Sequence, residues 1–216
     1  MTRQIPSTMP GNTMDVAFTP AVRAIQRARG SREGYQRMED RRPWARRMTP
    51  DVADFVARQT SVFLGTANAA GQPYIQHRGG PAGFLKALDD QQLAFAELEG
   101  NRQYITHGNL SENPRAVLFL IDYEELRRVK IWGRARVVEG DAALLARLAT
   151  PGQRAGAQRA IVFDIEAWDL NCPQHIPRRF GMGRIATLLA ERDARIAALE
   201  AELAAARRGQ DPDLGR

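Results

Sequence analysis

Residues 75–90 read IQHRGGPAGFLKALDD, a strand-like beginning that glycine and proline interrupt before apolar residues resume. Glycine and proline weaken the interior of a strand, so a stretch of this kind indicates a bend that serves a local purpose. Gly79, Gly80 and Gly83 have no side chain beyond the backbone, so they let N–H groups approach a bound group closely. We therefore expect the backbone to bulge here, beside a ligand.

The side chains around this bend have the chemistry of a site for a phosphate and a flat ring. Arg78 offers a bidentate guanidinium fork for a phosphate, and Lys86 offers a compact positive charge. Phe84 and Leu85 could line an apolar ring system. A glycine-rich bend with two solvated cations would have the same composition, so at this point both interpretations stay open.

Strand-like patterns lie on both sides of the bend. Residues 128–139 alternate, with Val129 and Ile131 on one face and Lys130 and Trp132 on the other, which is typical of a half-buried strand. The other strand-length runs are 61–68, 73–77, 92–98, 115–122 and 160–170. Six short strands with little room for crossover helices predict a mostly β fold, namely a six-stranded antiparallel barrel with flanking helices.

Helix signals lie at the two ends of the chain. Thr19 and Thr49 each precede a proline and begin an amphipathic segment, as an N-cap residue does. The N-terminal residues are polar and contain prolines, which is typical of a loose end. The predicted parts are a disordered N-terminus (1–14), an N-terminal helical segment (15–60), the barrel (61–180) and a C-terminal helix (181–216).

The C-terminal segment 184–208 contains neither glycine nor proline and is rich in Ala, Leu, Glu and Arg. Leu189, Ile196 and Leu203 recur every seven residues, as in the seam of a coiled coil, whereas Arg192 interrupts the second seam position. This pattern predicts either a dimerising coiled coil or an exposed, alanine-driven helix that packs on its own domain.

The chain is basic, with 31 Lys and Arg against 25 Asp and Glu and a formal net charge of +6. Between Arg23 and Arg47 there are nine arginines against three acidic residues, an excess equal to that of the whole chain. Tyr35 and Trp44 are the only aromatic residues there, whereas nucleic-acid surfaces usually interleave basic and stacking residues. We therefore favour a solvated arginine-rich face over a nucleic-acid partner, and an anionic partner stays open.

The single cysteine, Cys172, cannot form an intrachain disulfide, which favours a reducing compartment. The N-terminal residues contain no continuous apolar stretch of the kind found in a secretion signal. The longest run of large apolar residues, 116–121, is too short to span a bilayer. We expect a cytoplasmic protein that does not enter a membrane. Cys172 is interpreted either as a buried structural thiol or as a reactive one.

Two further groups of cations follow later strands. The first group lies near a turn at the start of residues 101–114, a segment that is predicted to begin as a helix, and unpaired amides and the helix dipole favour phosphate there. It contains Asn101, Arg102 and Tyr104. The second group lies on one face of the strand 128–139 and contains Arg128, Lys130 and Trp132. Cationic clusters at the ends of successive strands strengthen the phosphate interpretation.

These segments resemble a known family. The sequence from TANAAGQPYIQHRGG at 66–80 to RVKIWGRARVV at 128–138, together with NCPQHIPRRF at 171–180, resembles the FMN-binding split-barrel family related to pyridoxamine 5′-phosphate oxidase. More closely, it is similar to a bacterial branch with HRGGPxGFLK and NCPQHIP segments. The resemblance extends over residues 16–180 and includes several motifs in the same order.

The resemblance implies a homodimer of six-stranded split barrels with FMN bound at the subunit interface. It assigns the FMN phosphate to Arg78, Lys86, Asn101 and Arg102. It places the strand bearing Arg128, Lys130 and Trp132 against the flavin from the partner subunit. The expected set of cofactor-binding residues is completed by Phe84, Leu85 and Tyr104.

One departure from the family concerns the substrate. In pyridoxamine phosphate oxidases the Arg-to-Lys stretch follows the turn directly, whereas here HRGGPAG (77–83) intervenes and Pro81 occupies the place of their first phosphate arginine. Their substrate-phosphate residues have no counterpart in the C-terminal helix. The sequence therefore disfavours oxidation of vitamin B6.

Three functions remain open at this stage. The leading one is an FMN-dependent oxidoreductase that passes electrons from a reduced nicotinamide or a similar donor to an unknown small molecule, with no separate catalytic residue assigned. The alternative is a non-catalytic flavin or haem carrier or sensor, with His77 or His175 as axial haem ligands. A basic dimer that binds an anionic polymer through residues 23–47 is the third. The histidines show no paired metal-ligand spacing, so no metal site is predicted.

Overall fold

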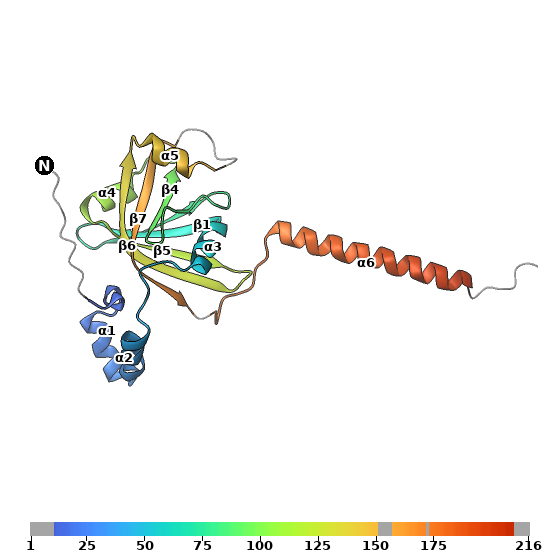
Figure 1. Cartoon of the computed structure of the whole chain (residues 1–216), viewed down its shortest axis with the longest axis horizontal. Helices are drawn as coiled ribbons and strands as arrows, with labels where there is room; N and C mark the ends of the chain where they lie inside the picture. The colour runs from blue at the N-terminus through green and yellow to red at the C-terminus, as the bar shows by residue number, and fades with distance from the viewer. Residues whose placement is uncertain (1–10, 151–156, 172, 210–216) are drawn as a thin grey trace, which may run out of the picture. The chain divides into compact units, whose positions relative to one another are not determined.

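The computed structural model describes residues 11–150, 157–171 and 173–209. The chain divides into two units. One unit comprises the chain up to Asp122 and the segment Arg127–Gln174, and it holds the sheet and the N-terminal helices (Figure 1). The other comprises Tyr123–Leu126 and the chain from His175 onward, and it holds the long C-terminal helix.

Seven antiparallel strands form a single sheet in the order β2-β1-β5-β6-β7-β4-β3. Their bounds are β1 Ser61–Ala67, β2 Pro73–Gly79, β3 Lys86–Ala87, β4 Gln92–Glu97, β5 Arg115–Asp122, β6 Arg127–Glu139 and β7 Arg159–Asn171. The predicted antiparallel barrel is confirmed, and each of the six predicted strands is present. The seventh strand, β3, was not predicted, because a two-residue strand has no detectable periodicity.

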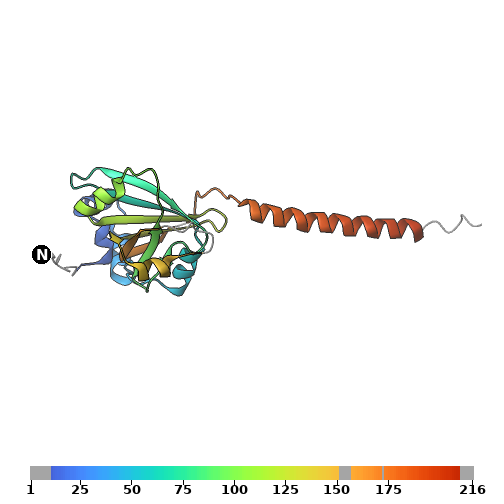
Figure 2. The same cartoon turned by 90° about the horizontal axis from the view of Figure 1, so that it is seen from above.

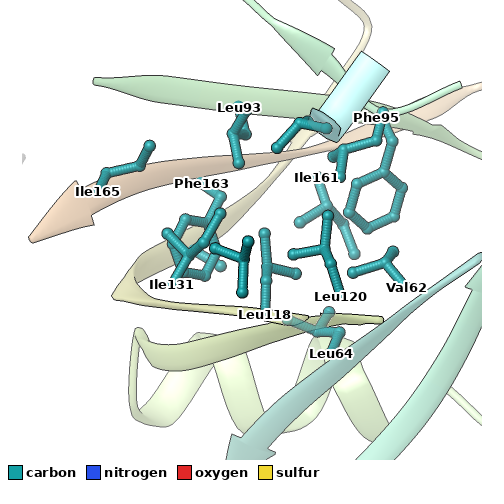
Figure 3. Packing of buried hydrophobic residues seen from close by; sticks show 14 of the residues in the cluster. Val62, Leu64, Leu93, Phe95, Leu118, Leu120, Ile131, Ile161, Phe163 and Ile165 are labelled. Carbon is teal, nitrogen blue, oxygen red and sulfur yellow. The ribbon is translucent and has the colours of Figure 1, made fainter. Parts of the chain in front are cut away.

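The core lies inside the curled sheet (Figure 3). Alternate residues of each strand point inward, so that β1 has a strictly alternating pattern of buried and partly exposed residues. Inward side chains from five strands converge there, among them Val62, Leu64, Leu93, Phe95, Leu118, Leu120, Ile131, Ile161, Phe163 and Ile165. A smaller apolar cluster under α5 (Ala142–Leu148) includes Leu148, which has no exposed surface.

The bend that interrupts residues 75–90 connects the two edges of this sheet, since β2 and β3 lie at opposite ends of the strand order. Gly83 has a left-handed backbone with φ +84°, and its N–H donates to the carbonyl of Ala57 at 2.7 Å. A Cβ on Gly80 would lie 2.6 Å from Cβ of Phe84, so only glycine fits there. Phe84 and Leu85 follow and are buried in the core. We refer to residues 80–85 as the edge strap.

Three short helices lie against the sheet, and two helices begin where the sequence predicted (Figures 1 and 2). The side-chain oxygens of Thr19 and Thr49 accept hydrogen bonds from the backbone amides of Val22 and Val52, each at 3.3 Å. The remaining helices are α1 Pro20–Ala28, α2 Arg32–Arg41, α3 Pro50–Arg58 and α4 Ile105–Glu112. α3 lies against β3, α4 against β1 and β6, and α5 against β4 and β7.

The N-terminal end is ordered from before the predicted boundary at residue 14. A short 3-10 helix, η1, spans Thr13–Val16, and Met14 has no exposed surface. Residues 1–10 of the predicted loose segment lie outside the described residues. The helix α2 lies within the predicted helical segment 15–60, but no signal marked its own bounds, because its sequence is almost entirely polar and shows no apolar stripe.

The C-terminal unit contains α6, which spans Met182–Gly209 and agrees with the predicted helix. Its described side chains are exposed throughout. α6 alone contributes 28 residues, so the mostly β description fits the barrel better than the whole chain. Among the residues that the structure describes, no helix combines the length and apolarity needed to cross a bilayer.

Candidate functional site

A cavity of about 340 Å³ opens between the end of β2, the end of β4 and the start of α4. Its volume is within the range of small-molecule sites, near the lower end. Polar and charged groups predominate in its wall. The lining residues are Tyr74, Gln76, Arg78, Glu97, Leu98, Glu99, Gly100, Asn101, Arg102, Gln103, Tyr104, Ile105, Thr106, His107, Gln158 and Arg159.

Glu97 is the centre of a hydrogen-bonded group in this wall. Arg78 donates from Nη2 to Oε1 of Glu97 at 2.9 Å and lies 3.4 Å from the hydroxyl of Thr106. The other carboxylate oxygen of Glu97 bonds to Nε2 of His107. The Glu97 side chain is only 11% exposed, so its charge is held inside the wall and neutralised there. Arg78 is thereby fixed with part of its guanidinium free for a ligand.

The loop between β4 and α4 curls through the left-handed backbone region. Arg102 and Tyr104 have φ values of 59° and 52°, which non-glycine residues rarely adopt. Arg102 is 68% exposed and pairs with Glu99, whose side chain is exposed to the same degree. Exposed ion pairs of this kind contribute little to stability, so Arg102 can exchange its carboxylate for a ligand oxygen at low cost.

Twelve of the sixteen lining residues were not predicted from the sequence, and two of them, His107 and Arg159, contact the predicted residue Tyr104. His107 lies three residues after Tyr104, so the two rings meet on one side of α4 with centroids 5.4 Å apart. That spacing could have indicated the pair. Arg159, the first residue of β7, places its guanidinium carbon 5.5 Å from the centroid of the Tyr104 ring. It is distant in sequence from the other lining residues, and no local pattern marks it.

The structure brings four of the ten predicted cofactor residues together in the cavity wall, namely Arg78, Asn101, Arg102 and Tyr104. It places Phe84 and Leu85 elsewhere, because their side chains face the barrel core. Nζ of Lys86 donates to the carbonyl oxygens of Arg147 and Ala149, at 2.9 and 3.0 Å, where α5 ends. Lys86 therefore lies outside the cavity wall.

The remaining three predicted residues, Arg128, Lys130 and Trp132, point outward from β6, as their alternation indicated. They form a separate face and line no part of the cavity. Lys130 lies opposite Phe119 on β5 and Asp169 on β7. Burial raises the pKa of the Asp169 carboxyl, and the positive charge of Lys130 partly opposes that rise.

The ring of Trp132 stacks on Trp44 from the N-terminal segment, with centroids 4.6 Å apart and planes 7° from parallel. The contact continues into Phe18, whose ring centroid lies 5.4 Å from that of Trp44. The N-terminal segment is also bound to β7, since Nε1 of Trp168 donates to the carbonyl of Arg47 at 2.9 Å. The helical segment therefore covers the outward face of β6 at Trp132.

Unsatisfied polar atoms occur both in the cavity wall, at Arg78, and on the outward face of β6, at Arg128. Among the described residues, four buried side-chain atoms lack a hydrogen-bond partner: Arg78 Nε, Arg128 Nε, Asn171 Oδ1 and Trp44 Nε1. Buried polar groups are nearly always satisfied, so such atoms indicate a missing ligand or partner. Arg78 Nε belongs to the cavity wall, where a phosphate oxygen would satisfy it. The donors present therefore fit the phosphate of FMN.

The other residues singled out in the sequence lie away from the cavity. His77 is exposed on β2, and its Nε2 lies 2.8 Å from the hydroxyl of Ser61. His175 is exposed, with a φ of 66°. In the described segments, no three His, Cys, Asp or Glu side chains are grouped so that they could hold a metal ion. Cys172 lies outside the described residues, so both interpretations of its thiol stay predictions.

Comparison with known proteins identifies a family whose model covers the part of the chain that forms the cavity. The model of the family described as Pyridoxamine 5'-phosphate oxidase matches residues 48–172, which include every residue that lines the cavity. No curated protein matches the chain.

Similar solved structures include HupZ from Group A Streptococcus, at 18% identity, with 62% of this chain and 100% of that chain covered and a TM-score of 0.48. A protein from Clostridium acetobutylicum related to general stress protein 26 is 17% identical, with 62% and 94% covered and a TM-score of 0.44. An FMN-binding protein from Syntrophomonas wolfei is 15% identical, with 68% and 97% covered and a TM-score of 0.40.

Proposed function

This chain belongs to the pyridoxamine 5′-phosphate oxidase family, and on that basis we propose that it is an FMN-binding oxidoreductase. It passes electrons from a reduced nicotinamide or a similar donor to a small molecule. The observation that supports this proposal best is the cavity wall. Arg78 and Arg102 offer guanidinium groups there, and the buried Nε of Arg78 has no hydrogen-bond partner. We assign the reaction to the cytoplasm, because the single cysteine suits a reducing compartment.

The phosphate of FMN is the part that the cavity would hold. Arg78 is oriented by Glu97 and presents Nε, while Arg102 is free to leave its exposed pair with Glu99. Asn101 adds an amide, and the ring of Tyr104 adds a flat surface at the cavity mouth. Arginine suits this role because its planar fork can donate two hydrogen bonds to phosphate at once.

The face of β6 would supply the second half of the site, from the other subunit of a homodimer. Arg128 there has a buried Nε without a partner among the described residues, and Lys130 supplies positive charge. When bound, FMN supplies the electron-transfer chemistry, and the protein contributes orientation and charge beside the ring. Lys130, which points outward on this face, would stabilise negative charge that develops on the ring.

Titration of the purified full-length protein with FMN, and separately with riboflavin, tests this proposal. We expect FMN to bind at least about tenfold more tightly than riboflavin, which has the same ring system but no phosphate. Bound FMN should then lose its visible absorbance on addition of NADH or NADPH without oxygen, and regain it when an electron acceptor is added.

The other outcomes separate the alternatives. FMN that binds but is not reduced by any donor would indicate the carrier or sensor function. Uptake of haemin, with a haem spectrum and no flavin binding, would indicate a haem protein. If FMN in excess fails to bind at all, or riboflavin binds equally well, the proposed phosphate site is wrong.

A further inference from the structure

The helix α6 carries a row of large apolar side chains on its surface. Met182, Ile185, Leu189, Ile196, Leu199 and Leu203 are each between 36% and 79% exposed. Alternating spacings of three and four residues keep such side chains on one side of a helix. A contiguous apolar row of this kind on a soluble surface indicates a binding face.

This row follows a heptad repeat over the whole helix. The a positions are Met182, Leu189, Ile196 and Leu203, and the d positions are Ile185, Arg192, Leu199 and Ala206. Four consecutive heptads, over a helix about 42 Å long, reach the length at which a coiled coil is recognisable. One of the four heptads has isoleucine at a with leucine at d, namely Ile196 and Leu199, and this combination favours two strands.

The charged residues at the e and g positions, which flank the seam, determine partner choice and helix orientation. In a parallel pair, each g residue lies next to the e residue five positions later on the partner helix. Arg195 at g would then face the partner's Glu200, and Glu202 at g would face the partner's Arg207. Both contacts join opposite charges, and two-fold symmetry repeats each of them.

These four side chains are available for such contacts. Among the described residues, Arg195, Glu200, Glu202 and Arg207 form no ion pair, although α6 carries other charged side chains that do. An antiparallel pair that matches Ile196 with Leu199 would join Arg195 to the partner's Glu202, which attracts, but would also bring Asp193 next to the partner's Glu200, which repels. The charge pattern therefore favours the parallel arrangement.

Arg192 at d is consistent with a function in alignment. A polar residue in the seam weakens a coiled coil but penalises any register that leaves it without a suitable neighbour. In the parallel, in-register pair, the d position adjoins the partner's e residue, which is Asp193. The guanidinium of Arg192 can extend to that carboxylate while its methylene groups stay in the seam.

We propose that α6 pairs with α6 of a second copy of this chain as a parallel, in-register, two-stranded coiled coil. Such a pair has a two-fold axis, the symmetry that a barrel homodimer also has, so that one dimer can contain both interfaces. The proposal does not depend on the flavin site, because it rests on residues of the C-terminal unit alone.

Disulfide trapping in the full-length protein tests the proposal. In a Cys172→Ser background, Ala206→Cys puts a thiol at a d position, and Ala201→Cys puts one at the opposite f position as a matched control. Both thiols lie on the same helix, so a dimer held together by the barrels alone would bring them together to the same extent. At equilibrium in a glutathione buffer, we expect an effective thiol concentration at least about tenfold higher for position 206 than for position 201.

Two further sets of variants check the mechanism. Arg195→Glu should lower cross-linking at position 206, and adding Glu200→Arg should restore it, because the exchanged charges again face each other. Cross-linking between a chain with Leu189→Cys and a chain with Ala206→Cys reports an antiparallel pair. Equal cross-linking at 206 and 201, dominant 189–206 cross-linking, or failure of the charge exchange to restore pairing would each overturn the proposal.

Discussion

Nη2 of Arg78 on β2 lies 2.9 Å from Oε1 of Glu97 at the end of β4, so an ion pair joins one edge strand to the strand beside the opposite edge. The sheet order separates these strands by four others, and only the curl of the barrel brings them together. The same pair forms part of the wall of the proposed phosphate site. One contact therefore both joins two strands across the barrel and orients the arginine that we propose binds phosphate.

Replacing Glu97 tests how much this contact stabilises the fold. We expect Glu97→Gln to lower the free energy of unfolding by about 2–4 kcal/mol, since it leaves Arg78 without its carboxylate in a buried wall. Denaturant unfolding measures the change. Glu99→Gln is the matched control, because its pair with Arg102 is exposed and should shift stability by less than about 0.5 kcal/mol. Equal effects of the two substitutions would contradict this account.

Arg102 offers the cleanest test of phosphate binding, because it is exposed and its loss should leave the fold intact. We expect Arg102→Ala to weaken FMN binding by about 1–3 kcal/mol, and to leave riboflavin binding unchanged. Fluorescence titration measures both affinities.

Two control variants accompany this measurement. Arg37→Ala removes the same charge from α2, and FMN affinity should stay as it is. Lys86→Ala should lower stability more than FMN affinity, since Lys86 bonds to carbonyls at the end of α5. A loss of FMN affinity as large as that in Arg102→Ala would instead place Lys86 at the phosphate.

Acid should loosen the N-terminal helices through Glu39. Hydrogen bonding by Arg32 holds the pKa of the Glu39 carboxyl below its ordinary value of 4.5, although burial opposes that shift, and Arg23 adds to it. A depressed carboxyl pKa stabilises the fold above the unfolded value, and this contribution is lost as pH falls through the folded value. We therefore expect the hydrogen-exchange protection factors of α1 and α2, which are corrected for the intrinsic exchange rate at each pH, to fall below about pH 4.5.

Glu39→Gln should remove this acid-dependent step and lower stability at neutral pH by about 1–3 kcal/mol. Glu33→Gln on the same helix is the control, because its side chain is 92% exposed and its contact with Arg37 is 3.9 Å long. An acid step that persists in Glu39→Gln would show that another group causes it.

Gly133 has no room for a side chain. It lies at a bulge in β6, and a Cβ there would be 2.0 Å from the carbonyl oxygen of Asp164 on β7. We expect Gly133→Ala to destabilise the protein by at least about 2 kcal/mol, as measured by thermal unfolding. Gly34 in α2 has nothing within 4 Å of its Cβ position, so that Gly34→Ala should instead stabilise by about 0.5–1 kcal/mol. Stability unchanged in Gly133→Ala would refute this packing.

Local sequence patterns were sufficient to predict the main elements of the barrel. Alternation in residues 128–139 identified β6, and the Thr-Pro pairs at Thr19 and Thr49 identified two helix starts, because these signals are contained within a few residues. The strand β3 and the bounds of the polar helix α2 were missed, since neither element has an apolar period of its own. Both depend on contacts with distant segments.

The site was predictable only in part, for a related reason. Arg78, Asn101, Arg102 and Tyr104 were identified by residue type and by nearness to strand ends. Phe84 and Leu85 have the composition of a ring-binding pair, but their place in the core follows from where the edge strap crosses, which composition does not reveal. Arg159 reaches Tyr104 only because β7 pairs with β4, a long-range contact.

The edge strap has a consequence for the order of folding. It joins the two margins of the sheet through only six residues, so the last gap in the barrel is bridged by neighbours in the chain rather than by a long-range search. Cutting the backbone within residues 80–85 would leave every strand present. The final step would then be an association of two strands, β2 and β3, that no loop connects directly. Refolding of the nicked protein should then be slower than that of the intact chain, even where the native contacts are the same.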